Sequence, residues 1–184
     1  EGPVDVPTDA DGKVVVEFIP VTDTPVTVVA EFAETDVYLE SSNEDTTEVG
    51  TMPTSLNVSA VDTRINGTSD ITVNLTDANG NPVNNGTIRL HFSDGTPDVE
   101  ITIPNGNTNT TFTSEFINTT VGKDVTVTAE FVPDEHSGYD PITGSDVFNV
   151  AKLNTSVDIE FGDVVAHNAS NVTITLNNIN DTVT

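Results

Sequence analysis

Apolar residues recur at every second position along most of the chain. In the segment "VTVVAEF", residues 26–32, the apolar residues at even positions share one face of an extended strand, and Thr27 and Glu31 face the other way. No segment carries a helical stripe of period 3.6. Period two with one apolar face is typical of half-buried antiparallel strands. The sequence therefore predicts an all-β protein, with the same alternation at 71–75, 88–92, 99–103, 112–116 and 125–131.

Turn residues divide these segments at regular intervals. The dipeptide Asn-Gly, which tolerates the positive φ angles of tight hairpins, begins at residues 66, 79, 85 and 105. Short strands separated by turns about every 8–12 residues are typical of a sandwich or barrel.

The chain also repeats itself. "VTVVAEF" at 26–32 returns as "VTVTAEF" at 125–131, and "SDITVNL" at 69–75 returns as "SNVTITL" at 170–176. "TSLNV" from Thr54 returns as "TSVDI" from Thr155, and "VDVP" from Val4 matches "ITIP" ending at Pro104. The period of about 100 residues is the size of one immunoglobulin-like (Ig-like) sandwich.

The positions at which the repeat begins and ends divide the chain into three parts. We expect tandem Ig-like β-sandwich modules: the C-terminal half of one module at 1–50, a complete module at 51–152, and the N-terminal part of a third at 153–184. The short linkers "GTMP" and "AKLN" favour a semi-rigid rod. In the first part, strands without a partner sheet are expected to carry Val14, Val16, Phe18, Val26, Val28 and Phe32.

Charge and composition exclude several classes of partner. Thirty acidic against five basic residues give a net charge of −25, which repels nucleic acid and anionic lipid. Thirteen of the acids and one base lie in residues 1–50. No apolar run approaches 18 residues, so we expect no direct membrane insertion in this segment. There is no cysteine and hence no disulfide.

Two stretches resemble known surface proteins. "NLTDANGNPV", residues 74–83, resembles the turn after the second strand of bacterial invasin- and intimin-like Ig repeats. "AEFVPDEHSGYDPITGSDVFNV", residues 129–150, is similar to the last two strands of Ig-like repeats in archaeal adhesin-like proteins. The resemblance implies a secreted protein that serves as a stalk, adhesin or envelope component.

The sequence offers no convincing catalytic set, and we expect neither enzymatic activity nor a cofactor. His91, His136 and His167 lie in separate segments. His136, Ser137 and Asp140 share one loop, but a Ser-His-Asp site needs a rigid scaffold and an oxyanion hole.

Calcium is a weaker expectation, with no firm site. "DANGN", with Asp77 and Asn79, imitates the opening of a calcium loop but lacks the later Glu that closes one, so a hairpin turn explains it better. Asp134, Glu135 and Asp140 form an oxygen-rich cluster where calcium would stiffen a module junction.

Glycosylation acceptors are in excess. The motif Asn-x-Ser/Thr occurs ten times, against roughly four expected from the composition. Asn66, Asn85 and Asn168 are expected to be the most accessible because they lie in or beside turns. The ten positions are Asn57, Asn66, Asn74, Asn85, Asn109, Asn118, Asn154, Asn168, Asn171 and Asn180.

These features predict an extracellular structural or adhesive protein whose partners are neighbouring copies of itself and the glycans or surfaces of cells. Residues 153–184 of one copy would begin a module that residues 1–50 of the next copy finish, which generates a head-to-tail, pilus-like filament. A continuous polypeptide that repeats this frame would give the same contacts. The remaining alternative is an arbitrary fragment with frayed ends. The alternative is a carbohydrate-binding or spacer module of a larger secreted enzyme, which would require an exposed aromatic platform.

Overall fold

The computed structural model describes residues 3–117 and 124–179, and the described chain is all-β, without a helix. This confirms the predicted fold class. The strands are β1 (Val26–Phe32), β2 (Ser41–Thr47), β3 (Thr54–Ala60), β4 (Thr63–Arg64), β5 (Thr68–Asp77), β6 (Gly86–Phe92), β7 (Val99–Ile103), β8 (Thr111–Ile117), β9 (Asp124–Pro133), β10 (Ile142–Ala151), β11 (Asn154–Phe161) and β12 (Val172–Ile179).

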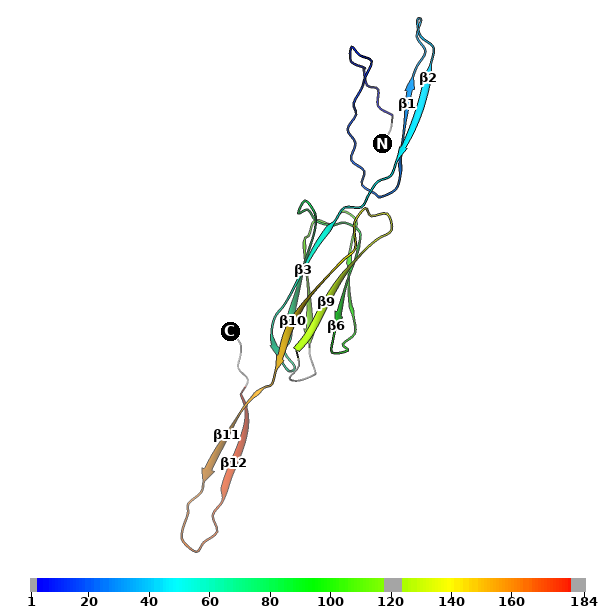
Figure 1. Cartoon of the computed structure of the whole chain (residues 1–184). Helices are drawn as coiled ribbons and strands as arrows, with labels where there is room; N and C mark the ends of the chain where they lie inside the picture. Colours follow the sequence, from blue (N-terminus) through cyan, green and yellow to red (C-terminus); the bar gives the residue numbers. More distant parts are fainter. Residues whose placement is uncertain (1–2, 118–123, 180–184) are drawn as a thin grey trace.

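Strands β3 to β10 form a two-layered sandwich in the middle of the molecule (Figure 1). One sheet has the order β3-β5-β8, and the other has the order β4-β10-β9-β6-β7. The pairs are antiparallel except β4, which runs parallel to the end of β10 and aligns Thr63 with Val150. The short second strand of the sandwich is therefore paired with the last one.

The hydrophobic core lies between these two sheets. Among the described residues, every buried hydrophobic side chain falls between Val58 and Val150. Phe116 of β8 reaches across to Phe92 of β6 and Phe148 of β10, with ring centroids 4.5 and 5.3 Å apart. This aromatic cluster joins the two layers.

Strand alternation places individual residues as predicted. Phe131 and Val127 of β9 are fully buried, whereas Thr126 is half-buried and Glu130 is exposed. The register of the five-stranded sheet that contains β9 is therefore the one that the period-two pattern requires.

Two contacts hold β10 close to β3 of the facing sheet. The Ala60 N–H donates to the Asp146 carboxylate at 2.9 Å. Leu56 lies directly over Gly144, where an added Cβ would come within 2.7 Å of the leucine Cδ2. Glycine at 144 thus permits the close approach of the two layers.

The segments on either side extend away from the sandwich in opposite directions (Figure 1). Residues 3–50 contribute the hairpin β1-β2, and residues 154–179 contribute the hairpin β11-β12. The expectation of strands around Val14, Val16 and Phe18 is wrong, because residues 3–25 form no strand.

We predict that Phe131→Ala lowers the free energy of unfolding of the sandwich by about 3–5 kcal/mol, the usual cost of deleting a buried Phe. Phe32, at the repeat position of Phe131, is 47% exposed. Phe32→Ala and Thr126→Ala should each change the sandwich by less than about 0.5 kcal/mol. Urea denaturation at a concentration that keeps copies separate measures all three. Equal costs for Phe131→Ala and Thr126→Ala would contradict the register.

Candidate functional site: the unpaired hairpins at both ends

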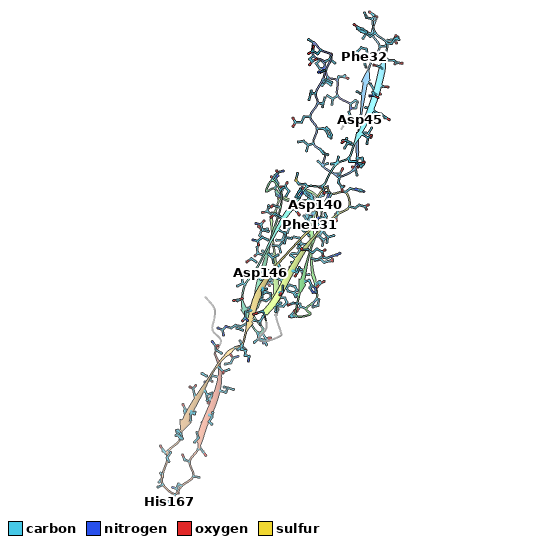
Figure 2. All side chains as sticks on the ribbon, viewed as in Figure 1. Phe32, Asp45, Phe131, Asp140, Asp146 and His167 are labelled. Carbon is cyan, nitrogen blue, oxygen red and sulfur yellow. The ribbon has the colours of Figure 1, made fainter. Side chains whose placement is uncertain are left out.

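The two end hairpins repeat strands of the sandwich but expose the side chains that the sandwich buries. We call two residues counterparts when the repeat aligns them, as it does for 26–32 with 125–131, 38–49 with 139–150, and 54–78 with 155–179. Leu75 is fully buried, whereas its counterpart Leu176 is 69% exposed. Figure 2 shows Phe32 on the N-terminal hairpin, away from the sandwich that encloses its counterpart Phe131.

The N-terminal hairpin has the same register as β9-β10. Val28 of β1 aligns with Asp45 of β2, and their counterparts Val127 and Asp146 align in the sandwich. The C-terminal hairpin likewise has the register of β3-β5. Val157 aligns with Leu176, as Leu56 aligns with Leu75. Each end segment therefore keeps the strand pair whose two members it contains.

The absence of other partners explains why residues 3–25 form no strand. In the sandwich, β7 pairs with β6, and β8 pairs with β5. Val4–Pro7 are counterparts of Ile101–Pro104, which cover the end of β7 and the residue after it. The shared triplet "EFI" aligns 13–19 with β8. Residues 3–50 contain no counterpart of β5 or β6, so neither segment has a ladder to join. An isolated extended segment gains too little to stay in a sheet.

The free edges at the two ends are complementary. Strand β5 pairs with both β3 and β8, whereas its counterpart β12 pairs with β11 alone among the described residues. In the sandwich Val73 aligns with Phe112 across β5-β8. The matching positions at the ends are Ile174 on β12 and Val14 in the unpaired segment. Both are apolar and exposed. Each end therefore presents the match of a sandwich position whose pairing partner has its match at the other end.

The contacts between the layers also have matches at the ends. Asp45 on β2 is the counterpart of Asp146, whose carboxylate accepts the Ala60 N–H in the sandwich. Asn43 replaces Gly144, and the shorter Val157 replaces Leu56, which reaches over that glycine. The match of Leu56 is therefore a smaller residue, and the match of Gly144 is a larger one.

The acidic loop at 134–140 makes structural contacts with the entering chain. The Met52 N–H donates to the Gly138 carbonyl at 2.7 Å, and the Asp140 N–H donates to the Met52 carbonyl at 3.0 Å. The Thr51 hydroxyl donates to the Asp140 carboxylate. Asp134 and Glu135 are exposed and belong to no cluster of metal-ligating side chains, because the described residues contain no group of three or more.

The histidine in this loop faces acidic side chains. His136 Nδ1 lies 3.2 Å from an Asp23 oxygen, and its Nε2 lies 3.5 Å from a Glu135 oxygen. The neighbouring Ser137 Oγ is buried and has no hydrogen-bond partner. The loop therefore does not place His136 as a base on Ser137. His91 is exposed on the outer face of β6 and bonds to Asp98 at 2.8 Å.

Asp77, the other calcium candidate, anchors a turn. Its carboxylate accepts the backbone N–H groups of Asn79 (2.8 Å) and Asn81 (2.7 Å) and the Asn81 side-chain amide (3.2 Å). Burial acts to raise the pKa of Asp77, but these bonds and one from Gly80 outweigh it and hold the pKa below its ordinary value. This arrangement is the hairpin turn that the sequence favours over calcium.

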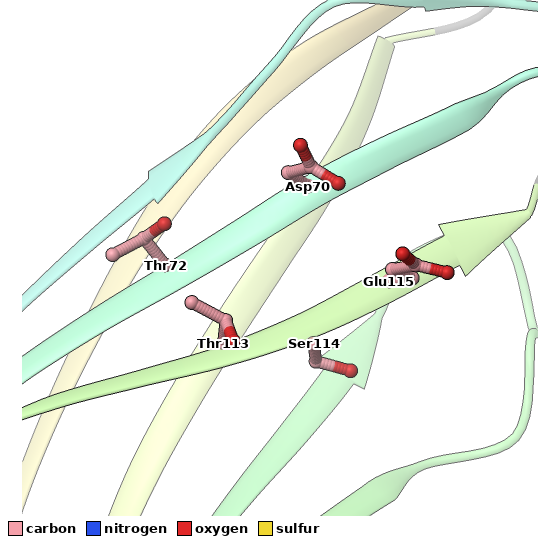
Figure 3. Close-up of a pocket in the computed structure, with 5 residues that line it drawn as sticks. All are labelled: Asp70, Thr72, Thr113, Ser114 and Glu115. Atoms are coloured by element: carbon pink, nitrogen blue, oxygen red, sulfur yellow. The ribbon is translucent and has the colours of Figure 1, made fainter.

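The hollow on the outer face of β5-β8 has a volume of about 360 Å³ and is lined by Asp70, Thr72, Thr113, Ser114 and Glu115 (Figure 3). Asp70 and Glu115 are register partners on neighbouring strands and carry like charges. The lining includes no aromatic ring on which a sugar could stack. This surface therefore does not favour the carbohydrate-binding alternative.

The acceptor asparagines are mostly exposed. Asn66 and Asn85 have φ angles of 62° and 55°, as turn residues do, but Asn85 is half-buried and less accessible than expected. Asn57 and Asn74 are register partners on the outer face of β3-β5. Asn118 and Asn180 lie outside the described residues. The exposed positions are Asn57, Asn66, Asn74, Asn109, Asn154, Asn168 and Asn171.

Sequence reasoning missed strand β2. Its sequence "SSNEDTT" has no apolar alternation, so the period-two pattern does not indicate a strand there. The repeat contains the missing signal, because these residues are counterparts of 142–148 in β10.

No family model matches the chain, and no curated protein matches it significantly. Within residues 3–117 and 124–179, no helix is long and apolar enough to cross a membrane.

We predict that Asp77→Asn destabilises the sandwich by about 1–3 kcal/mol at pH 7, because one amide oxygen replaces two carboxylate acceptors of N–H bonds. Since the folded-state pKa is lowered, the carboxylate stabilises above the unfolded value of about 3.9, and the effect is lost as the pH falls through the folded value. The difference between wild type and variant should therefore shrink below about pH 4. Urea denaturation across pH measures it.

Asp9 provides the matched control. Its carboxylate accepts the N–H groups of Asp11 and Lys13 in the same turn pattern, but outside the sandwich. Asp9→Asn should leave the unfolding of the sandwich unchanged. An equal effect of both variants would show that the Asp77 bonds contribute nothing specific.

We predict competition between glycans at Asn57 and Asn74. The Cβ atoms of directly opposed residues lie about 4.5–5.5 Å apart, too close for two chains to be added independently. In a glycosylating host, Asn57→Gln should raise the occupancy of Asn74, as measured by glycopeptide mass spectrometry. Asn66→Gln, in a separate turn, should not. Unchanged occupancy of Asn74 in both variants would show that the sites are modified independently or not at all.

Proposed function

We propose that this chain is a non-enzymatic extracellular structural or adhesive protein, built from Ig-like modules that join head to tail into a stalk or filament. Residues 153–184 of one copy supply the front of a module, and residues 1–50 of the next supply its back. The single observation that carries this proposal is that each end hairpin keeps the register of a sandwich strand pair while exposing the apolar face that the sandwich buries.

The topology of the sandwich supports the Ig-like part of the proposal. Sheets β3-β5-β8 and β10-β9-β6-β7, with β4 parallel to β10, have the two-sheet, Greek-key character of Ig-like domains. The resemblance of residues 74–83 and 129–150 to Ig-like repeats of surface proteins agrees with this arrangement.

The location of the two faces supports a filament. They are different surfaces at opposite ends of the molecule, so one chain does not satisfy both within itself (Figure 1). A contact between unlike surfaces that does not close on itself propagates into a fibre. Large exposed apolar surfaces of this kind mark interaction sites.

Cysteine crosslinking tests the proposed contact, since the chain has no native cysteine. In a Val14→Cys/Ile174→Cys variant, each thiol faces its match on the next copy, and mild oxidation should give a ladder of multimers on non-reducing gels. The matched control is Val15→Cys/Ile174→Cys. Residue 15 points to the opposite face of an extended strand, so its ladder should be much weaker.

Two outcomes would overturn the proposal: equal ladders from both variants, or a wild-type protein that remains monomeric in sedimentation at millimolar concentration. Denaturing electrophoresis of native material separates two forms of the assembly. A band near 19.4 kDa plus glycan indicates separate copies, and a much larger band indicates a continuous polypeptide.

A further inference from the structure

The described end segments repeat most of the sandwich strands. Residues 26–47 repeat β9 and β10, residues 154–179 repeat β3 and β5, and residues 4–7 and 13–19 match β7 and β8. No described segment outside the sandwich repeats β6. In the sandwich, β6 lies between β7 and β9 and pairs with both. Its side chains Ile88, Leu90 and Phe92 are essentially fully buried.

We propose that the free edge of β1 is an acceptor for an extended peptide strand with the chemistry of β6. This inference rests on the assembly proposed above and adds a component to it. The occupant has glycine at its start, apolar residues at every second position and a basic residue between them. The partner copy's β11-β12 hairpin is a different occupant, because it takes the positions of β3 and β5.

The edge of β1 is open in the structure. β9 pairs with β10 on one side and β6 on the other, whereas its counterpart β1 pairs with β2 alone among the described residues. A groove of about 1010 Å³ is lined by residues 3–5, by Val29, Phe32 and their neighbours on β1, and by residues 40–42 at the start of β2. In the sandwich, the matching elements β7 and β9 have β6 between them.

The requirement for glycine follows from Gly86. Its φ is +153°, and an added Cβ would lie 2.6 Å from the ring of Phe131 and 2.8 Å from the Val132 carbonyl oxygen. Phe32 and Ala33 occupy the same places at the end of β1. A strand that enters in this register therefore has no room for a side chain at that position.

The remaining preferences follow from the register of β6 on β9. Ile88 aligns with Phe131 and Leu90 with Ala129. Their counterparts Phe32 and Ala30 would receive the same apolar residues. Arg89 aligns with Glu130, whose counterpart is Glu31. A basic residue between the two apolar ones thus meets an acidic partner in a chain of net charge −25.

A synthetic peptide of residues 84–97, "NNGTIRLHFSDGTP", is the probe for this site. Labelled peptide should bind the full chain saturably in fluorescence anisotropy. It should also raise the crosslinking rate of the Val14→Cys/Ile174→Cys variant about tenfold, because it completes the module between two copies. Peptides carrying Gly86→Val or Arg89→Glu should each bind at least about tenfold more weakly.

A variant of the chain locates the binding. Phe32→Asp should abolish peptide binding, while an unchanged thermal unfolding of the sandwich shows that the middle of the chain remains folded. Equal binding by the three peptides, or binding unaffected by Phe32→Asp, would overturn the acceptor site.

The two readouts separate this inference from the assembly. Crosslinking in register that does not respond to the peptide overturns the acceptor site and leaves the assembly. Peptide binding that depends on Phe32 but yields no crosslinks supports the acceptor site and overturns the assembly. If neither peptide binding nor crosslinking is observed, both the acceptor site and the assembly are overturned.

Discussion

The covering of one sheet by another holds this molecule together. In the sandwich, the aromatic rings of Phe92, Phe116 and Phe148 and the Asp146–Ala60 bond close the space between the two layers. Pairing along a strand and covering of its face are separate requirements. The strands of the end hairpins are paired in the same register as in the sandwich, but no second sheet covers their apolar faces in the described part of the chain. The same sequence pattern therefore gives a buried core in one place and an exposed apolar surface in two others.

Much of the sandwich could be predicted from local pattern, because alternation along β9 alone indicates that Phe131 lies inside and Glu130 outside. Pairing partners are non-local, and local pattern does not reveal them. Residues 13–19 have a strand-like sequence, yet they form no strand without a counterpart of β5 beside them. Strand β2 shows the reverse, since "SSNEDTT" lacks a strand-like pattern but pairs with β1. Of the calcium candidates, Asp77 could be recognised as a turn anchor because glycine and asparagine follow it.

The density of acids at the N-terminal end coexists with its exposed apolar face. Glu31 projects from β1, and Glu44 and Asp45 lie on β2, beside the exposed Val28 and Phe32. Charged residues along an open edge oppose indiscriminate pairing with other strands. Like charges also repel a second copy unless its surface is apolar or basic. The acids would therefore restrict which surfaces could bind to the open face, while they keep it hydrated.

The parallel pairing of β4 with β10 gives the sandwich a defined response to tension. The chain enters the sandwich at Met52, which makes backbone hydrogen bonds with Gly138 and Asp140. It leaves the sandwich at Ala151, whose carbonyl accepts the Ile65 N–H at 3.0 Å. A pull on the two linkers drives the entering and leaving strands past each other along their length. The bonds between them are then strained together in shear instead of opening one by one like a zipper. A fibre of such units would resist stretching through its backbone hydrogen bonds, without any covalent crosslink.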